Sequence, residues 1–300
     1  MKPIHLVKFL RFGISSVLFK RKDPILGTII LTDKCNLSCK HCAVNNINGI
    51  IHPYTQIRSE MNLLYKKGIR ILFFCGGETF LWRDGERDIR YLVKEAKEMG
   101  FLIVNVVTNG TYLIDLPEAD LILLSLDGDR YNHNKIRGNT FDKIISNVRQ
   151  ATSNNICIYM AINKINKDDI VKVSNIAKNE PNIRAISFNF HTPYKGTEEL
   201  SLSYDNKKHC LEVIEDLINK GYPIFNLKSA FKYILNNSFK RPCYQCVVIE
   251  NGKISTCGRC IDEEGLCSQC GYFFVVEYSL IFNGNIKVIV DMFSTYLRYV

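Results

Sequence analysis

The sequence predicts an α/β protein, a partial (β/α)6 barrel followed by a small cysteine-rich, β-containing extension at the C-terminus. From residue 26 onward, short apolar runs alternate with charged amphipathic stretches. This alternation is typical of parallel strands whose outer face is covered by helices. Six such units in about 170 residues fit a partial barrel better than a closed barrel of eight units. An open doubly wound sheet is the alternative.

The expected elements follow in a regular order. The strands are near-continuous apolar runs at 26–32, 69–75, 101–108, 121–126, 156–162 and 185–189. The helices are stretches whose apolar residues recur with a helical period, at 54–67, 84–99, 141–152, 168–179 and 205–220. Together they predict a core domain over residues 24–225.

Polar or glycine-containing segments follow each of the expected strands. In barrels and doubly wound sheets alike, chemistry is found at the carboxyl ends of the strands. These segments therefore predict one shared site on one rim. They contain Cys35, Gly76-Gly77-Glu78, Thr108-Asn109-Gly110, Asp127-Gly128, Asn163 and His191.

Composition and charge narrow the class of protein. The 300 residues are 46% apolar and 11% aromatic, which describes a folding chain. No apolar run reaches the roughly 18 residues of a membrane span, and basic residues interrupt any secretory signal. We expect a cytoplasmic protein. The net charge of +9 suits either an anionic partner or simple solubility.

Residues 1–23 have the pattern of a basic amphipathic helix, with apolar positions that include Leu6, Phe9 and Leu10. One interpretation is a helix that caps the bottom of the barrel. The other is a helix on the membrane surface that gives access to lipid-like substrates, which makes the protein peripheral to the membrane.

Twelve cysteines in a reducing compartment indicate metal ligands or catalytic groups more than disulfides. Cys35, Cys39 and Cys42 form a C-x3-C-x2-C segment directly after the first strand. Three such thiolates can each bind one iron of a cubane cluster and leave the fourth iron open to a small chelating molecule. Zinc is the alternative, with His41 or His52 as the fourth ligand.

The segment Cys35-Asn-Leu-Ser-Cys39-Lys-His-Cys42 resembles the signature of the radical S-adenosylmethionine (radical SAM) superfamily, including its place after the first strand. Gly76-Gly77-Glu78 after the second strand is similar to the superfamily's GGE motif. That resemblance implies contact with the methionyl amino group of SAM. Two glycines also allow a backbone to approach a ligand closely.

Further matches concern the rest of SAM. Ser125 and Asp127 resemble the fourth-strand residues that approach the ribose. Arg137 resembles an arginine near the SAM carboxylate, a pairing that suits a guanidinium; an exposed helix-end residue is the alternative. Asn163 matches the fifth-strand position near the adenosine, although the glycine pattern often found there is absent.

The resemblance implies an enzyme, an oxidoreductase or a transferase, with a [4Fe–4S] cluster and SAM as cofactors. The cluster cleaves SAM reductively, and the 5′-deoxyadenosyl radical abstracts hydrogen from a peptide, small-molecule or lipid substrate. A ferredoxin or flavodoxin is the implied electron donor. The alternative is a non-catalytic iron–sulfur or zinc protein that serves in electron transfer or as an interaction module.

A second group of cysteines defines an expected C-terminal domain over residues 240–300, with a β-rich tail. The turn at 250–253 predicts a hairpin that brings Cys246 and Cys257 together. The group resembles the SPASM or twitch extensions of radical SAM enzymes, which implies an auxiliary iron–sulfur cluster; zinc is the alternative. Its members are Cys243, Cys246, Cys257, Cys260, Cys267 and Cys270.

The remaining cysteines and histidines are expected mainly to have structural positions. Cys75, Cys157 and Cys210 are expected to be buried or partly buried thiols. His133, His191 and His209 are expected in loops or on the surface; His191 together with Tyr194 could also face a substrate.

Overall fold

The computed structural model describes residues 24–42, 49–241, 243–257 and 263–299. Residues 1–23, where the sequence predicts a basic helix, and Cys260 lie outside the described residues.

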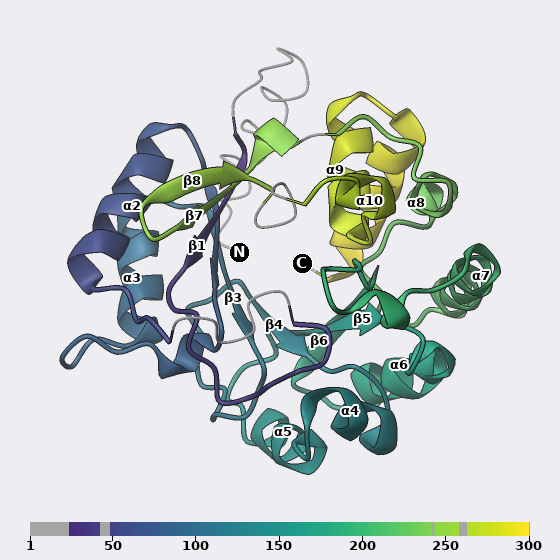
Figure 1. Cartoon of the computed structure of the whole chain (residues 1–300), viewed down its shortest axis with the longest axis horizontal. Coiled ribbons are helices and arrows are strands. Elements are labelled where there is room, and N and C mark those ends of the chain that lie inside the picture. The colour runs from purple at the N-terminus through teal and green to yellow at the C-terminus, as the bar shows by residue number, and fades with distance from the viewer. Residues whose placement is uncertain (1–23, 43–48, 242, 258–262, 300) are drawn as a thin grey trace.

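A single twisted sheet forms the centre of the molecule, with the strand order β6-β5-β4-β3-β2-β1-β7-β8 (Figure 1). Strands β1 to β6 pair in parallel, each with its neighbour in sequence. The predicted α/β class and the six predicted core strands are therefore confirmed. The strands are β1 (Leu26–Ile30), β2 (Ile71–Cys75), β3 (Ile103–Thr108), β4 (Leu121–Ser125), β5 (Ile156–Ile162), β6 (Ile183–Phe190), β7 (Cys246–Glu250) and β8 (Lys253–Thr256).

Helices cover the outer face of the curved sheet (Figure 1). The α-helices are α2 (Tyr54–Lys66), α3 (Ile89–Met99), α4 (Arg130–Arg137), α5 (Phe141–Arg149), α6 (Ile170–Asn179), α7 (Tyr204–Asn219), α8 (Phe231–Leu235), α9 (Phe273–Phe282) and α10 (Ile286–Tyr299). Short 3-10 turns are η1 (Thr79–Leu81), η2 (Lys167–Asp169), η3 (Glu198–Leu200), η4 (Lys228–Ala230), η5 (Cys243–Gln245) and η7 (Leu266–Gln269).

Capping explains where the second core helix begins. The prediction places its start at residue 84, but α3 begins at Ile89 because the Asp88 side chain accepts hydrogen bonds from Arg90 N and Tyr91 N. Residues 84 and 87 instead pair with each other in a turn. The helix ends at Met99, and Gly100, which follows it, adopts the left-handed conformation at φ 98°.

The main hydrophobic core lies between the sheet and this outer layer. Side chains on the outer face of the strands, such as Ile29, Leu72 and Val104, are fully buried against the helices. A smaller cluster lies on the inner face, where Leu26, Ile71 and Cys246 occupy paired positions on neighbouring strands.

The cysteine-rich segment begins as part of the core sheet. Strand β7 pairs in parallel with β1, and β8 returns antiparallel to β7. This confirms the predicted hairpin turn, and Cys257 N donates to Cys246 O at 3.0 Å. The hairpin thus extends one edge of the barrel sheet.

The predicted β-rich tail after residue 270 is wrong, because α9 and α10 occupy that stretch. The sequence of α9 is apolar all round and rich in β-branched and aromatic residues, a composition that fits a buried strand or a buried helix equally well. Helices α8 to α10 lie on the side of the molecule between β8 and β6 (Figure 1). Tyr278 and Phe282 of α9 pack against the inner-face cluster.

Within the described ranges, no single helix has the length and hydropathy of a membrane span. Helices α9 and α10 reach those values only as a pair that is bent by 119° at the break between them.

Candidate active site at the carboxyl edge of the sheet

The loop that carries Cys35, Cys39 and Cys42 leaves β1 at the carboxyl edge of the sheet and is tied to two neighbouring elements. Gly77 N donates to Thr32 O at 2.7 Å, and Glu78 N donates to Lys34 O at 3.0 Å. On the other side, Lys40 N donates to Ile136 O of α4 at 3.0 Å. The loop therefore lies between the GGE segment and α4.

Glycine is required where the GGE segment passes this loop. A Cβ atom on Gly76 would lie 2.3 Å from Thr32 O, and one on Gly77 would lie 2.3 Å from Lys34 O. Because both obstacles are backbone atoms, neither can move aside cheaply. The two glycines thus hold the segment directly against the residues that lead into Cys35.

The Glu78 carboxylate points into the protein and is fully buried. It accepts from Thr108 Oγ1 at 2.7 Å, from Asn109 N at 2.7 Å and from Phe80 N at 3.0 Å. Burial raises the pKa of Glu78, and these donors oppose the rise. The Glu78 carboxylate thus connects the segment after β2 to the end of β3, and its oxygens are already hydrogen-bonded within the protein.

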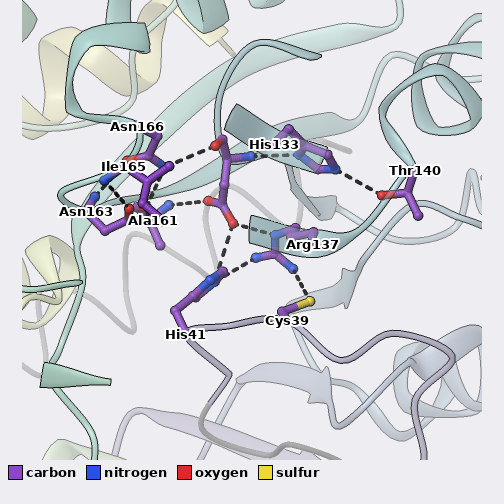
Figure 2. A network of polar contacts seen from close by, with 10 residues as sticks. Cys39, His41, His133, Arg137, Thr140, Ala161, Asn163, Ile165 and Asn166 are labelled. Atoms are coloured by element: carbon purple, nitrogen blue, oxygen red, sulfur yellow. Dashed lines mark hydrogen bonds and ion pairs between the residues drawn. The ribbon is translucent and has the colours of Figure 1, made fainter. Parts of the chain in front are cut away.

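Asp127 is the centre of the polar network on this rim. Its carboxylate is fully buried and accepts from Arg137 Nε and, at 2.7 Å, from Ala161 N. The same guanidinium contacts Cys39: Figure 2 shows Arg137 beside Cys39, and Arg137 Nη1 lies 3.7 Å from Cys39 Sγ. Burial raises the pKa of Asp127, but the Arg137 charge and the other contacts outweigh burial and hold it below its ordinary value. Arg137 is thus a paired, mostly buried cation.

His41, between two of the cysteines, faces the same network. Its Nε2 lies 3.2 Å from Arg137 Nη2 and 3.4 Å from Asp127 Oδ2. Burial lowers the pKa of His41 to about 4, so the ring is neutral at pH 7. The buried Nδ1 atom has no hydrogen-bond partner among the described residues.

The structure corrects the expectation for His133, which is fully buried on α4. Asp127 N donates to His133 Nδ1 at 3.1 Å, and His133 Nε2 lies 3.1 Å from Thr140 Oγ1 (Figure 2). Since Nδ1 accepts, the hydrogen is on Nε2 and points to Thr140. His191 is buried as well, with Nε2 at 3.0 Å from Thr197 Oγ1, whereas His209 is exposed as expected.

The other predicted SAM residues lie on this rim but differ in their surroundings. Ser125 is buried at the end of β4. Asn163 is buried after β5, where its Oδ1 accepts from Ile165 N at 2.8 Å and its Nδ2 donates to Ala161 O at 3.3 Å (Figure 2). The Asn163 side chain therefore stabilises its own loop.

The three thiols of the first cluster are close enough to influence one another. Burial raises the pKa of Cys35, and it raises the pKa of Cys39 to about 11; in both cases Cys42 adds to the rise, while Arg137 opposes it at Cys39. Among the described residues, no three His, Cys, Asp or Glu side chains converge on a single metal ion. Three soft thiols beside a buried guanidinium, with an unpartnered buried imidazole nitrogen, form a donor set that fits an iron–sulfur cluster with a chelated anionic ligand.

The second cysteine group is only partly described. Cys246 is buried on β7, Cys257 follows β8, and Cys267 is exposed within η7. Arg241 Nη2 donates to Cys267 O at 2.7 Å, which brings the chain just before Cys243 close to Cys267. Cys270 is partly exposed at the start of the stretch that leads into α9.

The isolated cysteines fit their expectations. Cys157 and Cys210 are buried, and Cys75, at the end of β2, is partly exposed. Burial raises the pKa of Cys75 to about 11 and Cys42 contributes to that rise, so Cys75 lies near the first cluster.

An α/β partial barrel with a cysteine triad, a GGE segment and an aspartate–arginine pair on its carboxyl rim defines a class of metal-dependent enzymes. The model of the radical SAM superfamily matches residues 29–177. A GTP 3′,8-cyclase of Clostridium perfringens is 25% identical over 262 residues, which cover 81% of this chain and 79% of that protein. The antilisterial bacteriocin subtilosin biosynthesis protein AlbA of Bacillus subtilis is 21% identical over 220 residues, covering 65% and 48%.

Solved structures agree on the fold. SuiB of Streptococcus suis, bound to its precursor peptide SuiA, superposes with a TM-score of 0.64 at 15% identity and covers 96% of this chain and 72% of that chain. The chain belongs to the radical SAM superfamily, and it is an enzyme of that class. Membership implies a [4Fe–4S] cluster and SAM as cofactors.

Sequence reasoning missed two residues of the site. The sequence pattern predicts a loop or surface position for His133, but this residue lies on the same face of α4 as the buried Ile136, three residues further along. The sequence pattern places Asn109 in a polar loop without a partner. Its contacts with Asn36 and Cys35 of the cysteine loop span 73 and 74 residues along the chain. No local sequence pattern indicates a contact between residues so far apart along the chain.

Proposed function

We propose that this enzyme cleaves SAM reductively at a [4Fe–4S] cluster held by Cys35, Cys39 and Cys42, and uses the resulting 5′-deoxyadenosyl radical to abstract hydrogen from its substrate. The observation that carries the proposal is the contact of Arg137 with both Asp127 and Cys39. It puts a fixed cation beside a sulfur of the triad, where a chelating carboxylate would arrive. When bound, the cluster supplies the electron, and the protein supplies position and exclusion of water.

Different residues of the rim would bind different parts of SAM. The backbone of Gly76-Gly77-Glu78 would face the amino group, and Arg137 would pair with the carboxylate. Asp127 fixes the Arg137 guanidinium, and Ser125 and Asp127 stand at the positions expected near the ribose. Asn163 stands at the position expected near the adenosine. Its side chain bonds Ile165 N, so it would act by holding the loop after β5 in place.

A peptide is the substrate class that we favour, with a small molecule or a lipid as the alternatives. Support comes from similarity to a bacteriocin biosynthesis protein and from the fold shared with a structure that holds a precursor peptide. Similarity to a GTP 3′,8-cyclase supports a small molecule.

We also propose an auxiliary iron–sulfur cluster in the C-terminal region, with ligands from the second cysteine group and zinc as the alternative metal. The pairing of Cys246 with Cys257 across the hairpin supports a shared site. A ferredoxin or flavodoxin would reduce the protein in the cytoplasm. Contact of residues 1–23 with a membrane surface would appear as co-sedimentation with anionic vesicles that is lost when these residues are removed.

The test of the main proposal is SAM cleavage. The protein is reconstituted without oxygen, reduced with dithionite and given SAM, and 5′-deoxyadenosine is measured by chromatography. We expect product from the intact protein and none from a variant with Cys35, Cys39 and Cys42 changed to Ala. A matched control with the buried Cys157 and Cys210 changed to Ala should still form product.

Metal analysis of the same proteins separates the remaining alternatives. Iron and sulfide that persist in the triple variant would support the auxiliary cluster, and zinc in their place would support the zinc alternative. An intact protein that carries a full cluster yet forms no 5′-deoxyadenosine would instead indicate a non-catalytic iron–sulfur protein.

A further inference from the structure

Asn109 follows β3 and is almost completely buried, and its side-chain amide has only one orientation that satisfies its neighbours. Thr111 N donates to Asn109 Oδ1 at 3.0 Å, and Thr111 Oγ1 donates to the same oxygen at 2.7 Å. The Thr111 hydroxyl must donate here because it accepts from Asn36 Nδ2 at 2.8 Å. The oxygen of the Asn109 amide therefore faces Thr111.

The amide nitrogen consequently faces the cysteine loop. Asn109 Nδ2 donates to Asn36 Oδ1 at 2.9 Å and lies 3.7 Å from Cys35 Sγ. Its two hydrogens thus serve one loop oxygen and one sulfur. The main chain of Asn109 is held as well, because Asn109 N donates to the buried Glu78 carboxylate at 2.7 Å.

The Asn109 amide approaches the Cys35 sulfur from outside the cysteine loop. The Cys35 sulfur lies near N–H groups from its own loop and from the residue that follows β3. Leu37 N lies 3.4 Å from this sulfur, and Asn109 Nδ2 lies 3.7 Å from it. Leu37 belongs to the cysteine loop itself, whereas Asn109 approaches from another strand.

We infer that Asn109 is a positioning residue that donates an N–H···S hydrogen bond to the Cys35 sulfur and thereby raises the reduction potential of the cluster. The inference rests on the proposed function, because it needs a cluster on the triad. Hydrogen bonds to the sulfurs stabilise the reduced cluster, which carries one more negative charge than the oxidised cluster, and so make reduction easier.

The experiment compares midpoint potentials of reconstituted holoprotein without SAM, measured by redox titration followed by electron paramagnetic resonance. The signal of this cluster is the one that disappears in the triple cysteine variant. Two variants remove the donor, Asn109→Ala and the isosteric Asn109→Asp, which puts an oxygen where the nitrogen was. We expect both midpoint potentials to become more negative than that of the unsubstituted protein.

Two control variants separate this effect from others. Asn147→Ala removes a hydrogen bond to Gly110 O at 2.8 Å, so it disturbs the loop after β3 without touching a sulfur. Asn36→Asp introduces the same charge as Asn109→Asp beside the cysteine loop. The backbone Thr111 N still donates to Asn109 Oδ1 in this variant, which keeps the Asn109 amide nitrogen toward Cys35. We expect no shift from the first control and a smaller shift from the second than from Asn109→Asp.

The results decide between clear outcomes. An unchanged potential in both Asn109 variants, or an equal shift in Asn147→Ala, overturns the inference. So does a shift in Asn36→Asp as large as that in Asn109→Asp. If the alanine variant does not fold, the comparison of the two aspartate variants alone decides. Absence of any iron and sulfide on the triad in the unsubstituted protein would be a failure of the proposed function instead.

Discussion

His133 shows how a single buried side chain organises the candidate site. Its Nδ1 accepts the backbone N–H of Asp127, and its Nε2–H reaches Thr140, so one ring joins the end of β4 to α4 and the loop that follows it. Burial and, to a lesser extent, the Arg137 charge lower the pKa of His133 to about 4, against the opposing charge of Asp127. The ring is therefore neutral at pH 7 and keeps the tautomer that these contacts need.

We predict that His133→Ala lowers the free energy of unfolding by about 2 kcal/mol or more. The substitution leaves the buried Asp127 N–H without an acceptor, which costs about 1–3 kcal/mol, and it opens a cavity besides. Urea denaturation monitored by circular dichroism measures the loss. His209→Ala, on the exposed side of α7, serves as the control and should change stability by less than about 0.5 kcal/mol. Equal losses in both variants would contradict this role.

Among the elements, α9 shows how tertiary contacts can decide between helix and strand. The helix is apolar on every side, and most of its residues are buried. Its one charged residue, Glu277, is buried too and accepts from Leu227 N at 3.0 Å and from Asn226 Nδ2 at 3.4 Å. Asn226 Oδ1 in turn accepts from Phe188 N of β6. Glu277 therefore links α9 to the edge strand β6 of the sheet.

We predict that the folded state becomes less stable as pH rises, because the buried Glu277 must then carry a charge. Burial raises the pKa of Glu277 from 4.5 to about 7. Between those values the folded protein keeps a proton that the unfolded chain has lost, so stability falls with rising pH over that range and then stays level. The loss amounts to at most about 3 kcal/mol, since one pKa unit corresponds to about 1.4 kcal/mol.

The variant Glu277→Gln tests this prediction, because glutamine keeps an acceptor oxygen but does not titrate. Denaturation midpoints at pH 5 and pH 8 should differ less in this variant than in the unsubstituted protein. Glu98→Gln, at an exposed position of α3, is the matched control and should leave the difference unchanged. A pH dependence that survives in Glu277→Gln would rule out Glu277 as its source.

In the molecule as a whole, the cysteine-rich segment and the barrel share one sheet. Strand β7 covers the edge of β1, and Tyr278 and Phe282 of α9 cover apolar residues on the inner face of the strands. The sequence predicts a separate C-terminal domain over 240–300. Because both regions contribute strands to one sheet, we expect the barrel and the C-terminal region to stabilise each other.

We therefore predict that a chain without residues 242–300 does not fold. It would expose the unpaired edge of β1 together with Leu26 and Ile71 of the inner-face cluster. Soluble yield and the cooperativity of thermal unfolding, followed by circular dichroism, measure the result against the full chain. A truncated chain that unfolds cooperatively at the same temperature would show instead that residues 24–241 form an independent domain.

Much of this protein could be predicted from its sequence because the signals are local. Apolar runs and helical periods depend on neighbouring residues, and they predicted all six core strands with ends within about two residues. The cysteine spacing and the GGE segment are equally local, and so is the Asn251-Gly252 turn, which has positive φ at both residues.

Only the tertiary structure decided how these parts work together. The Asp127–Arg137–Cys39 contacts, the amide of Asn109 on Cys35 and the acceptance of the Asp127 N–H by His133 join separate elements at the rim. The α9 sequence is compatible with strand or helix, and packing on the inner face selected the helix. The sequence by itself determined which cysteines and glycines could carry radical SAM chemistry, because spacing is a property of the chain. The partners of those residues depend on distances between chain segments, which only the folded sheet defines.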